Sequence, residues 1–511
     1  MIARTYSATL VGVDAVEVEI ESHDGGGTPK MFIVGLPDAS VKESRERVTA
    51  AISSCGFLMN DGVTTVNLAP ADLKKEGPGF DLPIAISLIA HRCRIPIAGL
   101  AETAMIGELA LNGELRPVRG LLAVALEARR KGRKRLLVPR RAAIEASVVA
   151  GIDIIGCASL REVVDYLKGD IELQAEPCRA AEFFAAADHY DIDFADVKGQ
   201  DHAKRAIEVA VAGGHNLLMV GPPGTGKSMI AKRICTIMPK MTEEEAIETT
   251  KIHSASGLLG EVAAFVATRP FRAPHHTISD AGLLGGGTNP GPGEISLANH
   301  GVIFLDELPE FRRSTLEVLR QPLEDGRVTI ARAAGTVTFP ASTLLVAAMN
   351  PCPCGFYGDA KRACRCTSTM VQRYRQRISG PLLDRIDLHV DVPLVDYKAL
   401  SSTAAEESSA SIRQRVEQAR GLQAERFKGQ PGLHTNSRMT PRLIKKHCEL
   451  DAECGGLLEH AMGEMNFSAR AHDRILKVAR TLADLKGLEK LDADSILEAI
   501  NYRTLDRNLW T

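Results

Sequence analysis

The sequence predicts an α/β fold with a helical C-terminal part, and three observations support this prediction. An apolar run, Leu217–Val220, is followed by a glycine-rich loop and then by a helical stretch. Further short apolar runs occur at Val302–Leu305 and Leu344–Met349, as is typical of strands in a buried parallel sheet. Beyond residue 395 the hydrophobic pattern is helical. The predicted organisation is an α/β domain at 1–170, a linker at 171–191, an α/β core at 192–395 and a helical lid at 396–511.

The composition is that of an ordinary globular protein. Its 511 residues are 45% hydrophobic and 25% charged, and a chain of this length predicts two or three domains. The net charge of −2 provides no general attraction to nucleic acid, so any such surface must be local. No apolar run approaches the roughly 18 residues of a membrane span, and Met1–Leu10 lacks the apolar core of a signal peptide. We therefore expect a cytoplasmic protein with no membrane partner.

The N-terminal domain mixes strand and helix patterns. The predicted strands are 8–20, 31–35 and 63–68, and the predicted helices are 38–55, 80–90 and 121–131. The last of these helices runs into a dense basic stretch, 129–135, which Arg140 and Arg141 follow. Two interpretations of this stretch remain open, a solvated helix end or a patch that contacts phosphates.

Two segments of this domain resemble the proteolytic domain of Lon-type proteases. Lys75–Asp81 resembles the segment that carries the nucleophilic serine, and Pro117–Leu122 resembles the segment that carries the lysine base. Gly79 and Leu122 stand at those two positions. Since a Ser–Lys mechanism needs a hydroxyl and an amine, the resemblance implies a Lon-like fold that is inactive as a protease.

The glycine-rich loop has the P-loop pattern G-x-x-x-x-G-K-[ST]. Its glycines let backbone N–H groups turn toward a phosphate, and the N-terminus of the following helix adds partial positive charge. We expect Lys227 to reach the β- and γ-phosphates of ATP and Ser228 to hold Mg²⁺. The loop consists of Gly221, Pro222, Pro223, Gly224, Thr225, Gly226, Lys227 and Ser228.

Two carboxylates follow directly where the second apolar run ends, which is the Walker B arrangement. Asp306 is predicted to hold Mg²⁺, directly or through water, and Glu307 to orient and deprotonate the attacking water. The alternative is a buried strand that merely ends in acidic residues, and the P-loop upstream makes it the weaker one.

Two further segments of the core resemble AAA+ ATPases. Asp196–Gln200 resembles their adenine-side entry segment, which implies that Val197 and Gly199 lie near the base. Asn350 ends the run Leu344–Met349, where AAA+ proteins place the sensor of the γ-phosphate or of the lytic water.

Two arginines match the branch of AAA+ proteins that contains Mg-chelatase and MCM. Gly380–Leu388 resembles its L-L-x-R-F/I-D segment, which implies that Arg385 acts on the ATP of the neighbouring subunit as an arginine finger. Arg470, in a segment that opens a lid helix, matches the second-sensor arginine, and Arg474 one turn later is its rival.

The segment 327–339 predicts a β-hairpin, because β-branched residues alternate on both sides of a turn near Gly335. In the Mg-chelatase and MCM branch a hairpin at this place projects into the ring channel. The resemblance therefore implies that Arg327 and Arg332 contact nucleic-acid phosphates. An exposed hairpin with ordinary charges is the alternative.

Four cysteines lie within fifteen residues, Cys352, Cys354, Cys364 and Cys366. Two C-x-C pairs joined by a loop can close tetrahedrally on Zn²⁺, so we predict a structural zinc site without a catalytic role. Four unligated thiols are the alternative. For the adjacent histidines His275 and His276 we expect no shared metal, because neighbouring residues on a strand point to opposite faces.

Taken together, the whole chain is similar to the ComM/YifB family of Mg-chelatase-like AAA+ ATPases. This resemblance implies a homohexameric ring that uses ATP and Mg²⁺ to act on DNA, as a helicase or in branch migration during recombination in natural transformation. The alternative is a chaperone that remodels proteins, as the related chelatase subunit does. The basic hairpin and the cysteine cluster favour DNA. The segments that carry the resemblance are 221–228, 269–276, 304–307, 350–355, 380–388 and the Lon-like N-terminal domain.

Overall fold

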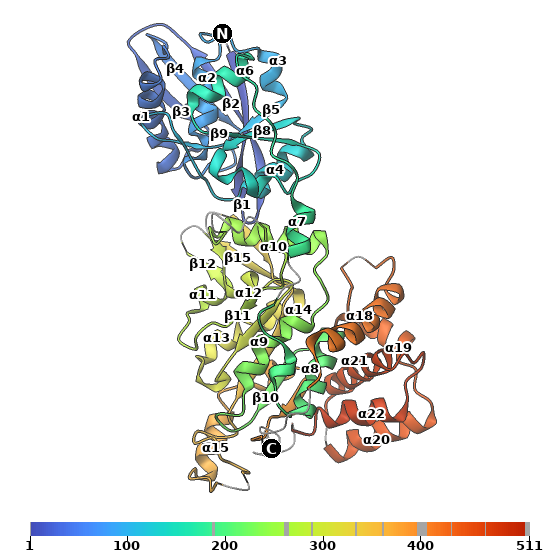
Figure 1. The fold of residues 1–511 in the computed structure, drawn as a ribbon. Helices are drawn as coiled ribbons and strands as arrows, with labels where there is room; N and C mark the ends of the chain where they lie inside the picture. Colours follow the sequence, from blue (N-terminus) through green and yellow to red (C-terminus); the bar gives the residue numbers. More distant parts are fainter. Residues whose placement is uncertain are drawn as a thin grey trace. The chain divides into compact units, whose positions relative to one another are not determined.

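The structure is a computed structural model. It describes residues 2–186, 190–259, 265–287, 290–332, 335–359, 362–395, 406–430, 432–465 and 467–505. The chain divides into two compact units, Met1–Asp188 with Glu243–Ala267, and His189–Thr242 with Thr268–Thr511 (Figure 1).

The first unit is built on a mixed seven-stranded sheet in the order β3-β4-β2-β1-β5-β8-β9. β1 and β2 are antiparallel, as are β2 and β4, and the remaining neighbours are parallel. The predicted strand at 8–20 is wrong, because the chain turns at Gly12 and Val13 and forms two strands there. The strands are β1 (Ile2–Val11), β2 (Asp14–Asp24), β3 (Lys30–Val34), β4 (Val63–Ala69), β5 (Thr103–Met105), β8 (Arg135–Pro139) and β9 (Asp153–Cys157), with the short pair β6 (Glu108–Leu109) and β7 (Leu115–Arg116).

The helices of the first unit include one that comes from the middle of the chain, α10. Glu145 ties it to α4, because its carboxylate accepts hydrogen bonds from Ser254 Oγ of α10 and, at 3.1 Å, from Leu122 N. Burial raises the pKa of Glu145 despite these bonds. The helices are α1 (Ala39–Ser54), α2 (Asp81–Ile89), α3 (Ile97–Ala101), α4 (Leu121–Arg130), α5 (Ala143–Ala146), α6 (Leu160–Lys168), α7 (Ala180–Ala186), which lies in the predicted linker, and α10 (Glu243–Ala255).

The basic stretch after α4 is largely paired with carboxylates of the same unit. Arg133 forms two hydrogen bonds of 2.9 Å with Glu17, and its guanidinium lies 3.5 Å from the ring centre of Tyr6. The structure therefore favours the solvated, salt-bridged interpretation over a phosphate patch. The other pairs are Arg130–Glu127, Lys134–Glu102, Arg140–Glu162 and Arg141–Glu114.

The second unit is built on a parallel five-stranded sheet in the order β11-β14-β17-β10-β18. Its three central strands are buried along their whole length, which explains why they were visible as continuous apolar runs. The strands are β10 (Leu217–Val220), β11 (Phe271–Arg272), β14 (Val302–Leu305), β17 (Leu344–Met349) and β18 (Leu388–Asp391), with two antiparallel pairs, β12 (Gly285–Gly286) with β13 (Gly291–Pro292) and β15 (Arg327–Arg332) with β16 (Gly335–Pro340).

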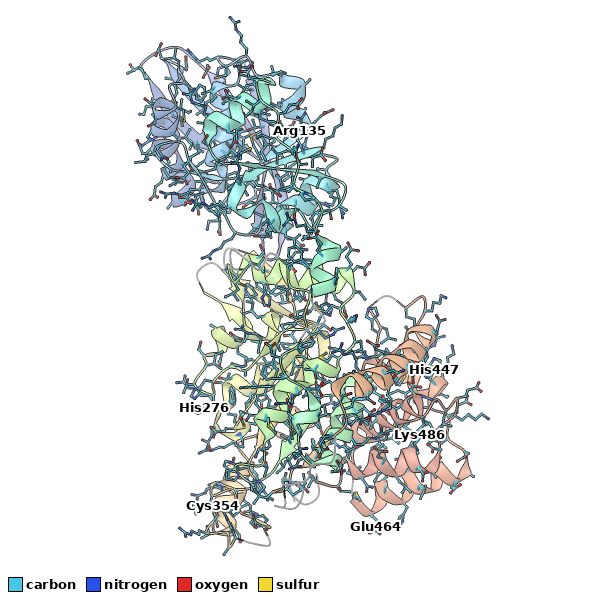
Figure 2. The ribbon with its side chains drawn as sticks, in the orientation of Figure 1. Arg135, His276, Cys354, His447, Glu464 and Lys486 are labelled. Carbon is cyan, nitrogen blue, oxygen red and sulfur yellow. The ribbon has the colours of Figure 1, made fainter. Side chains whose placement is uncertain are left out.

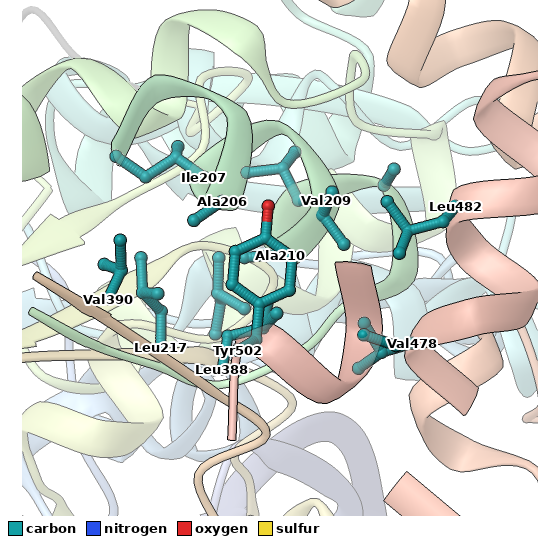
Figure 3. Close-up of a cluster of buried hydrophobic side chains, with 14 of the residues drawn as sticks. Ala206, Ile207, Val209, Ala210, Leu217, Leu388, Val390, Val478, Leu482 and Tyr502 are labelled. Atoms are coloured by element: carbon teal, nitrogen blue, oxygen red, sulfur yellow. The ribbon is translucent and has the colours of Figure 1, made fainter. Parts of the chain in front are cut away.

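Helices cover this sheet, and a helical bundle follows it in the chain. Figure 3 shows Tyr502 among side chains of α8, of the strands β10 and β18, and of the lid helix α21. The lid therefore shares one core with the sheet. Each fully buried aliphatic side chain in this core stabilises the fold by roughly 1.5–3 kcal/mol. The helices are α8 (Asp201–Gly213), α9 (Lys227–Ile237), α11 (Asp280–Leu284), α12 (Glu294–Leu297), α13 (Arg313–Glu317), α14 (Arg320–Asp325), α15 (Ser368–Arg375), α16 (Gly380–Leu383), α18 (Ser409–Arg426), α19 (Pro441–His447), α20 (Ala452–Met465), α21 (Ala469–Leu485) and α22 (Ala493–Asn501).

Within the ranges that the structure describes, no helix is both long enough and apolar enough to span a membrane.

Candidate nucleotide-binding site

The P-loop connects the central strand β10 to helix α9, as predicted. Gly224 and Gly226 have φ angles of 80° and 86°, a region that glycine adopts without strain. Gly221 is needed for a different reason, because a Cβ atom there would lie 2.2 Å from the carbonyl oxygen of Val392. The glycines therefore let the loop turn sharply over the carboxyl ends of the parallel strands, where open α/β sheets bind their ligands.

The side chain of Lys227 lies inside the loop. Its Nζ donates hydrogen bonds to the carbonyl oxygens of Gly221 at 2.7 Å and Pro222 at 2.8 Å. It also lies 3.5 Å from Oδ1 of Asn350, the residue that follows β17. Burial lowers the pKa of Lys227, and the nearby carboxylate of Asp306 opposes that effect. The structure thus brings together the predicted phosphate-binding lysine and the predicted sensor.

The two predicted magnesium ligands also meet. Ser228 Oγ donates a hydrogen bond of 2.6 Å to Oδ2 of Asp306, and the other carboxylate oxygen accepts one of 2.9 Å from the backbone N–H of Glu307. A hydroxyl and a carboxylate are the hard oxygen ligands that Mg²⁺ takes in nucleotide sites. The residues present therefore fit the ion that the sequence predicts.

Glu307 has an unusual backbone, with φ 52° and ψ 46°. Its carboxylate Oε2 lies 3.5 Å from Nδ1 of His276. Sequence reasoning missed this contact. The sequence-based prediction treats His275 and His276 only as possible metal ligands on a strand. In the structure the two histidines lie in a loop, and their ring centres are 4.1 Å apart. The available signal was the pair of adjacent histidines in the loop between β11 and α11.

Arg385 is buried, with an exposed fraction of 7%. Its guanidinium donates to the carbonyl oxygens of Arg320 at 3.2 Å and Pro381 at 2.6 Å, and it pairs with Glu324 at 2.5 Å. These partners belong to the same chain, so a finger that acts on a neighbouring subunit must exchange them for the new partner. Its role in trans stays a prediction.

The two candidates for the second-sensor arginine differ in their surroundings. Arg470 lies exposed in the first turn of α21. Arg474 is engaged elsewhere, because its Nη1 lies 2.6 Å from Oδ1 of Asp387, whose Oδ2 lies 3.3 Å from Nδ1 of His215. Of the two, Arg470 is the side chain that no ion pair holds within the described ranges, and its role as the second sensor stays a prediction.

On the predicted adenine side, Val197 is buried and Gly199 donates its backbone N–H to Oε1 of Glu406 at 3.0 Å. Lys204 holds the same carboxylate at 2.6 Å. The entry segment is thereby attached to the residues that precede the first helix of the lid, α18.

The four cysteines converge, and all four sulfur atoms lie within 4.8 Å of one another. Cys352 Sγ is 3.4 Å from Cys354 Sγ and 3.7 Å from Cys364 Sγ. Tetrahedral ligation with Zn–S bonds of about 2.3 Å places sulfur atoms about 3.8 Å apart, so the cluster fits zinc. Figure 2 labels Cys354 at this cluster.

The loop that carries Cys352 and Cys354 also packs on the P-loop, since a Cβ atom on Gly355 would lie 2.5 Å from Pro223 Cδ.

The predicted hairpin is present as β15 and β16, with Arg327 opposite Pro340 and Arg332 opposite Gly335. Val328 and Ile330 are buried, whereas Arg327 and Thr329 are exposed. The turn residues 333 and 334 and the side chain of Arg332 lie outside the described part of the chain. Arg327 is therefore the one predicted phosphate contact whose exposure the structure describes.

At Gly79, where the resemblance to Lon-type proteases places their nucleophilic serine, the structure leaves little room for a side chain. A Cβ atom on Gly79 would lie 3.0 Å and 3.2 Å from two side-chain carbons of Ile106, and 3.7 Å from one of Val118. Position 79 is thus enclosed by aliphatic groups.

A parallel sheet that carries a glycine-rich loop after β10, an asparagine after its neighbour β17 and a carboxylate pair after the next strand, β14, defines a P-loop nucleotide-binding fold. Three family models, all of magnesium chelatase subunits, match successive parts of the chain. "Subunit ChlI of Mg-chelatase" matches residues 16–142, "Magnesium chelatase, subunit ChlI" matches 193–400, and "Magnesium chelatase, subunit ChlI C-terminal" matches 406–503.

Whole-length relatives agree with these matches. The competence protein ComM of Haemophilus influenzae is 42% identical over 99% of this chain and 98% of its own length. The YifB protein of Escherichia coli is 42% identical over 99% of this chain and 97% of its own length. A local match of 31% identity to the DNA replication licensing factor MCM5 of Arabidopsis thaliana covers 30% of this chain and 18% of that protein. The chain belongs to the ComM/YifB family of Mg-chelatase ChlI-like AAA+ proteins.

Proposed function

We propose that the protein is a cytoplasmic, homohexameric AAA+ motor that hydrolyses ATP to move on DNA, as a helicase or branch-migration enzyme in recombination during natural transformation. The observation that carries this proposal is the convergence of Lys227, Ser228, Asp306, Glu307 and Asn350 at one edge of the sheet. The exposed Arg327 on the hairpin supports contact with DNA phosphates. The printed name of the H. influenzae relative, a competence protein, supports the biological setting.

In the proposed mechanism, the P-loop backbone and Lys227 hold the phosphates of ATP, and Ser228 and Asp306 hold Mg²⁺. Mg²⁺, when bound, neutralises charge that develops on the phosphates. Glu307 takes a proton from the attacking water, and Asn350 orients that water or the γ-phosphate. Arg385 of the neighbouring subunit and Arg470 of the same chain add positive charge at the transferred group.

Two parts of the chain serve this motor without chemistry of their own. We assign the N-terminal domain a Lon-like fold that is inactive as a protease, because Gly79 and Leu122 replace the two groups a Ser–Lys mechanism requires. We assign the cysteine cluster to a structural zinc, whose four ligands leave no position for a substrate.

The decisive experiment measures ATP hydrolysis by the purified full-length protein with and without single-stranded, duplex, forked and four-way DNA, together with strand displacement. We expect DNA to stimulate hydrolysis and ATP to drive displacement, and Lys227→Ala to abolish both. An assembled ring that hydrolyses ATP but neither responds to DNA nor displaces a strand would contradict the proposal.

A second candidate is a protein-remodelling chaperone, which the matches to magnesium chelatase subunits favour. In that case ATP hydrolysis would respond to a protein partner and not to DNA. The same assay therefore distinguishes the two candidates.

A further inference from the structure

The loop after the edge strand β11 reaches the predicted general base. β11 is parallel to β14, with Phe271 opposite Val302 and Arg272 opposite Ile303. Residues that follow these two strands therefore leave the sheet at the same edge. His276 follows β11 and Glu307 follows β14, and their side chains meet with Nδ1 3.5 Å from Oε2. Figure 2 labels His276 in this part of the second unit.

The imidazole of His276 is held from several sides. Its ring centre lies 4.1 Å from that of His275 and 6.4 Å from that of Phe311, with an interplanar angle of 76° to the latter. Phe311 is buried. The strand in front of the loop is fixed as well, because Arg272 forms two hydrogen bonds, of 2.6 and 2.7 Å, with the carboxylate of Glu294. His276 is thus a fixed point beside the site.

The side chain of Glu307, in contrast to that of His276, is held by few contacts. Its side chain is 56% exposed, and among the described residues its one ion-pair contact is with His276. Its backbone lies in the left-handed region, which non-glycine residues seldom adopt and which is found more often at functional sites. A carboxylate on a flexible stem samples several rotamers, so a neighbouring donor decides how often it points in one direction.

We propose that His276 is a positioning residue for Glu307 and so sets the rate of ATP hydrolysis. This proposal rests on the proposed function, in which Glu307 activates the attacking water. The imidazole restricts the carboxylate to the orientation that serves the water, and pre-organisation of this kind changes kcat more than ATP affinity. ATP affinity depends instead on the P-loop, in which Lys227 and Ser228 lie. His276 does not touch the nucleotide phosphates in this scheme and is no metal ligand.

The test compares the full-length protein with His276→Ala, His276→Gln and His275→Ala. His275→Ala is the matched control, because its ring contacts Thr277 at 2.9 Å and the neighbouring imidazole, but not Glu307. We expect His276→Ala to lower kcat about tenfold while the Kd for a fluorescent ATP analogue and the Tm stay close to wild type. His276→Gln retains a donor and should recover about a third of the wild-type kcat. His275→Ala removes a ring that flanks His276 but leaves the contact between His276 and Glu307, so its loss of kcat should be clearly smaller than that of His276→Ala.

An unchanged or increased kcat in His276→Ala would overturn the proposal, and so would an equal loss in His275→Ala. If His276→Ala does not fold, a wild-type kcat in His276→Gln together with a wild-type kcat in His276→Phe would overturn it instead. Glu307→Gln separates this proposal from the proposed function. Normal hydrolysis by Glu307→Gln would remove the assigned base and both proposals with it, whereas an inactive Glu307→Gln beside a fully active His276→Ala would refute the role of His276 alone.

Discussion

Replacing Asp387 by Asn tests how firmly the lid holds the segment that carries Arg385. In the structure, one oxygen of Asp387 lies 2.6 Å from Arg474 Nη1 and the other lies 3.3 Å from His215 Nδ1. The side chains of Asp387, Arg474 and His215 are 12%, 19% and 0% exposed, so this cluster lies largely out of water. Asn preserves the volume of Asp387 but leaves the guanidinium of Arg474 without its counter-charge.

The size of the effect follows from burial. Removing one partner of a fully buried ion pair costs about 3–5 kcal/mol. Because Arg474 retains some contact with water, we expect a loss of about 2–3 kcal/mol in the free energy of unfolding. One kcal/mol shifts Tm by about 2–4 °C in a domain of 150–250 residues, and by less in a larger one. Calorimetry should therefore show a decrease in Tm of about 5 °C at pH 7.

The pH dependence of the Tm difference shows whether the charge of Asp387 causes it. Burial alone would raise the pKa of Asp387, but Arg474 and His215 outweigh it and hold this pKa below its ordinary value. A lowered carboxyl pKa stabilises the folded state above the unfolded-state pKa of about 3.9, and this contribution is lost as the pH falls further. The difference in Tm between wild type and Asp387→Asn should thus be constant from about pH 7 to 5 and shrink below about pH 4.

Asp391→Asn is the matched control, because this aspartate ends the same strand, β18, and burial raises its pKa. It should not lower Tm at pH 7. Equal Tm values for wild type and Asp387→Asn at pH 7, or a deficit that persists unchanged at low pH, would refute the reasoning.

Three further predictions concern the site and the domains around it. Arg385→Ala should bind ATP but hydrolyse it at least tenfold more slowly, as measured by phosphate release, and mixing it with Lys227→Ala protein should restore part of the activity at mixed interfaces. Normal hydrolysis by Arg385→Ala alone would contradict the finger assignment. Cys364→Ser should reduce the zinc content from about one per chain to near zero and lower Tm, whereas Cys178→Ser, outside the cluster, should change neither. Metal analysis that finds no zinc in the wild type would contradict the zinc site. Gly79→Ser should not confer cleavage of an unfolded protein substrate, and cleavage by the wild type would refute the inactive assignment.

The central part of the site could be predicted from sequence because each of its pieces is local. A buried parallel strand is a continuous apolar run, and the residue that follows it stands at the carboxyl edge of the sheet. Lys227, Asp306 and Asn350 each follow such a run closely, so three separate stretches of sequence predict one place. Their proximity depends on the strand order, which the sequence alone does not provide and the sheet shows.

Elements that depend on where a chain turns were harder to predict. The alternation of Val11, Val13 and Val16 continues across the turn between β1 and β2, so period-two reasoning joined two strands into one. Similarly, the helical pattern beyond residue 395 does not show that one helix, α19, ends before residues 448–451 and that another, α20, begins after them. His276 was missed for a related reason, because a loop conformation sets the direction of its ring and no periodicity describes a loop.

A single side chain that carries no motif connects the predicted finger to the nucleotide site. Asn216, just before β10, donates from Nδ2 to the carbonyl oxygen of Arg385 at 2.9 Å and accepts at Oδ1 from Leu345 N of β17 at 3.0 Å. Its own carbonyl oxygen accepts from the N–H groups of Asp387 and Leu388. The backbone of the finger segment is therefore bonded to the strands that lead into the P-loop and into Asn350. The Asp387 side chain also pairs with Arg474 of α21, so the same segment is bonded to the C-terminal helices as well. Asn216 and Asp387 thus hold the backbone around Arg385 from two sides, the strands of the nucleotide site and the C-terminal helices.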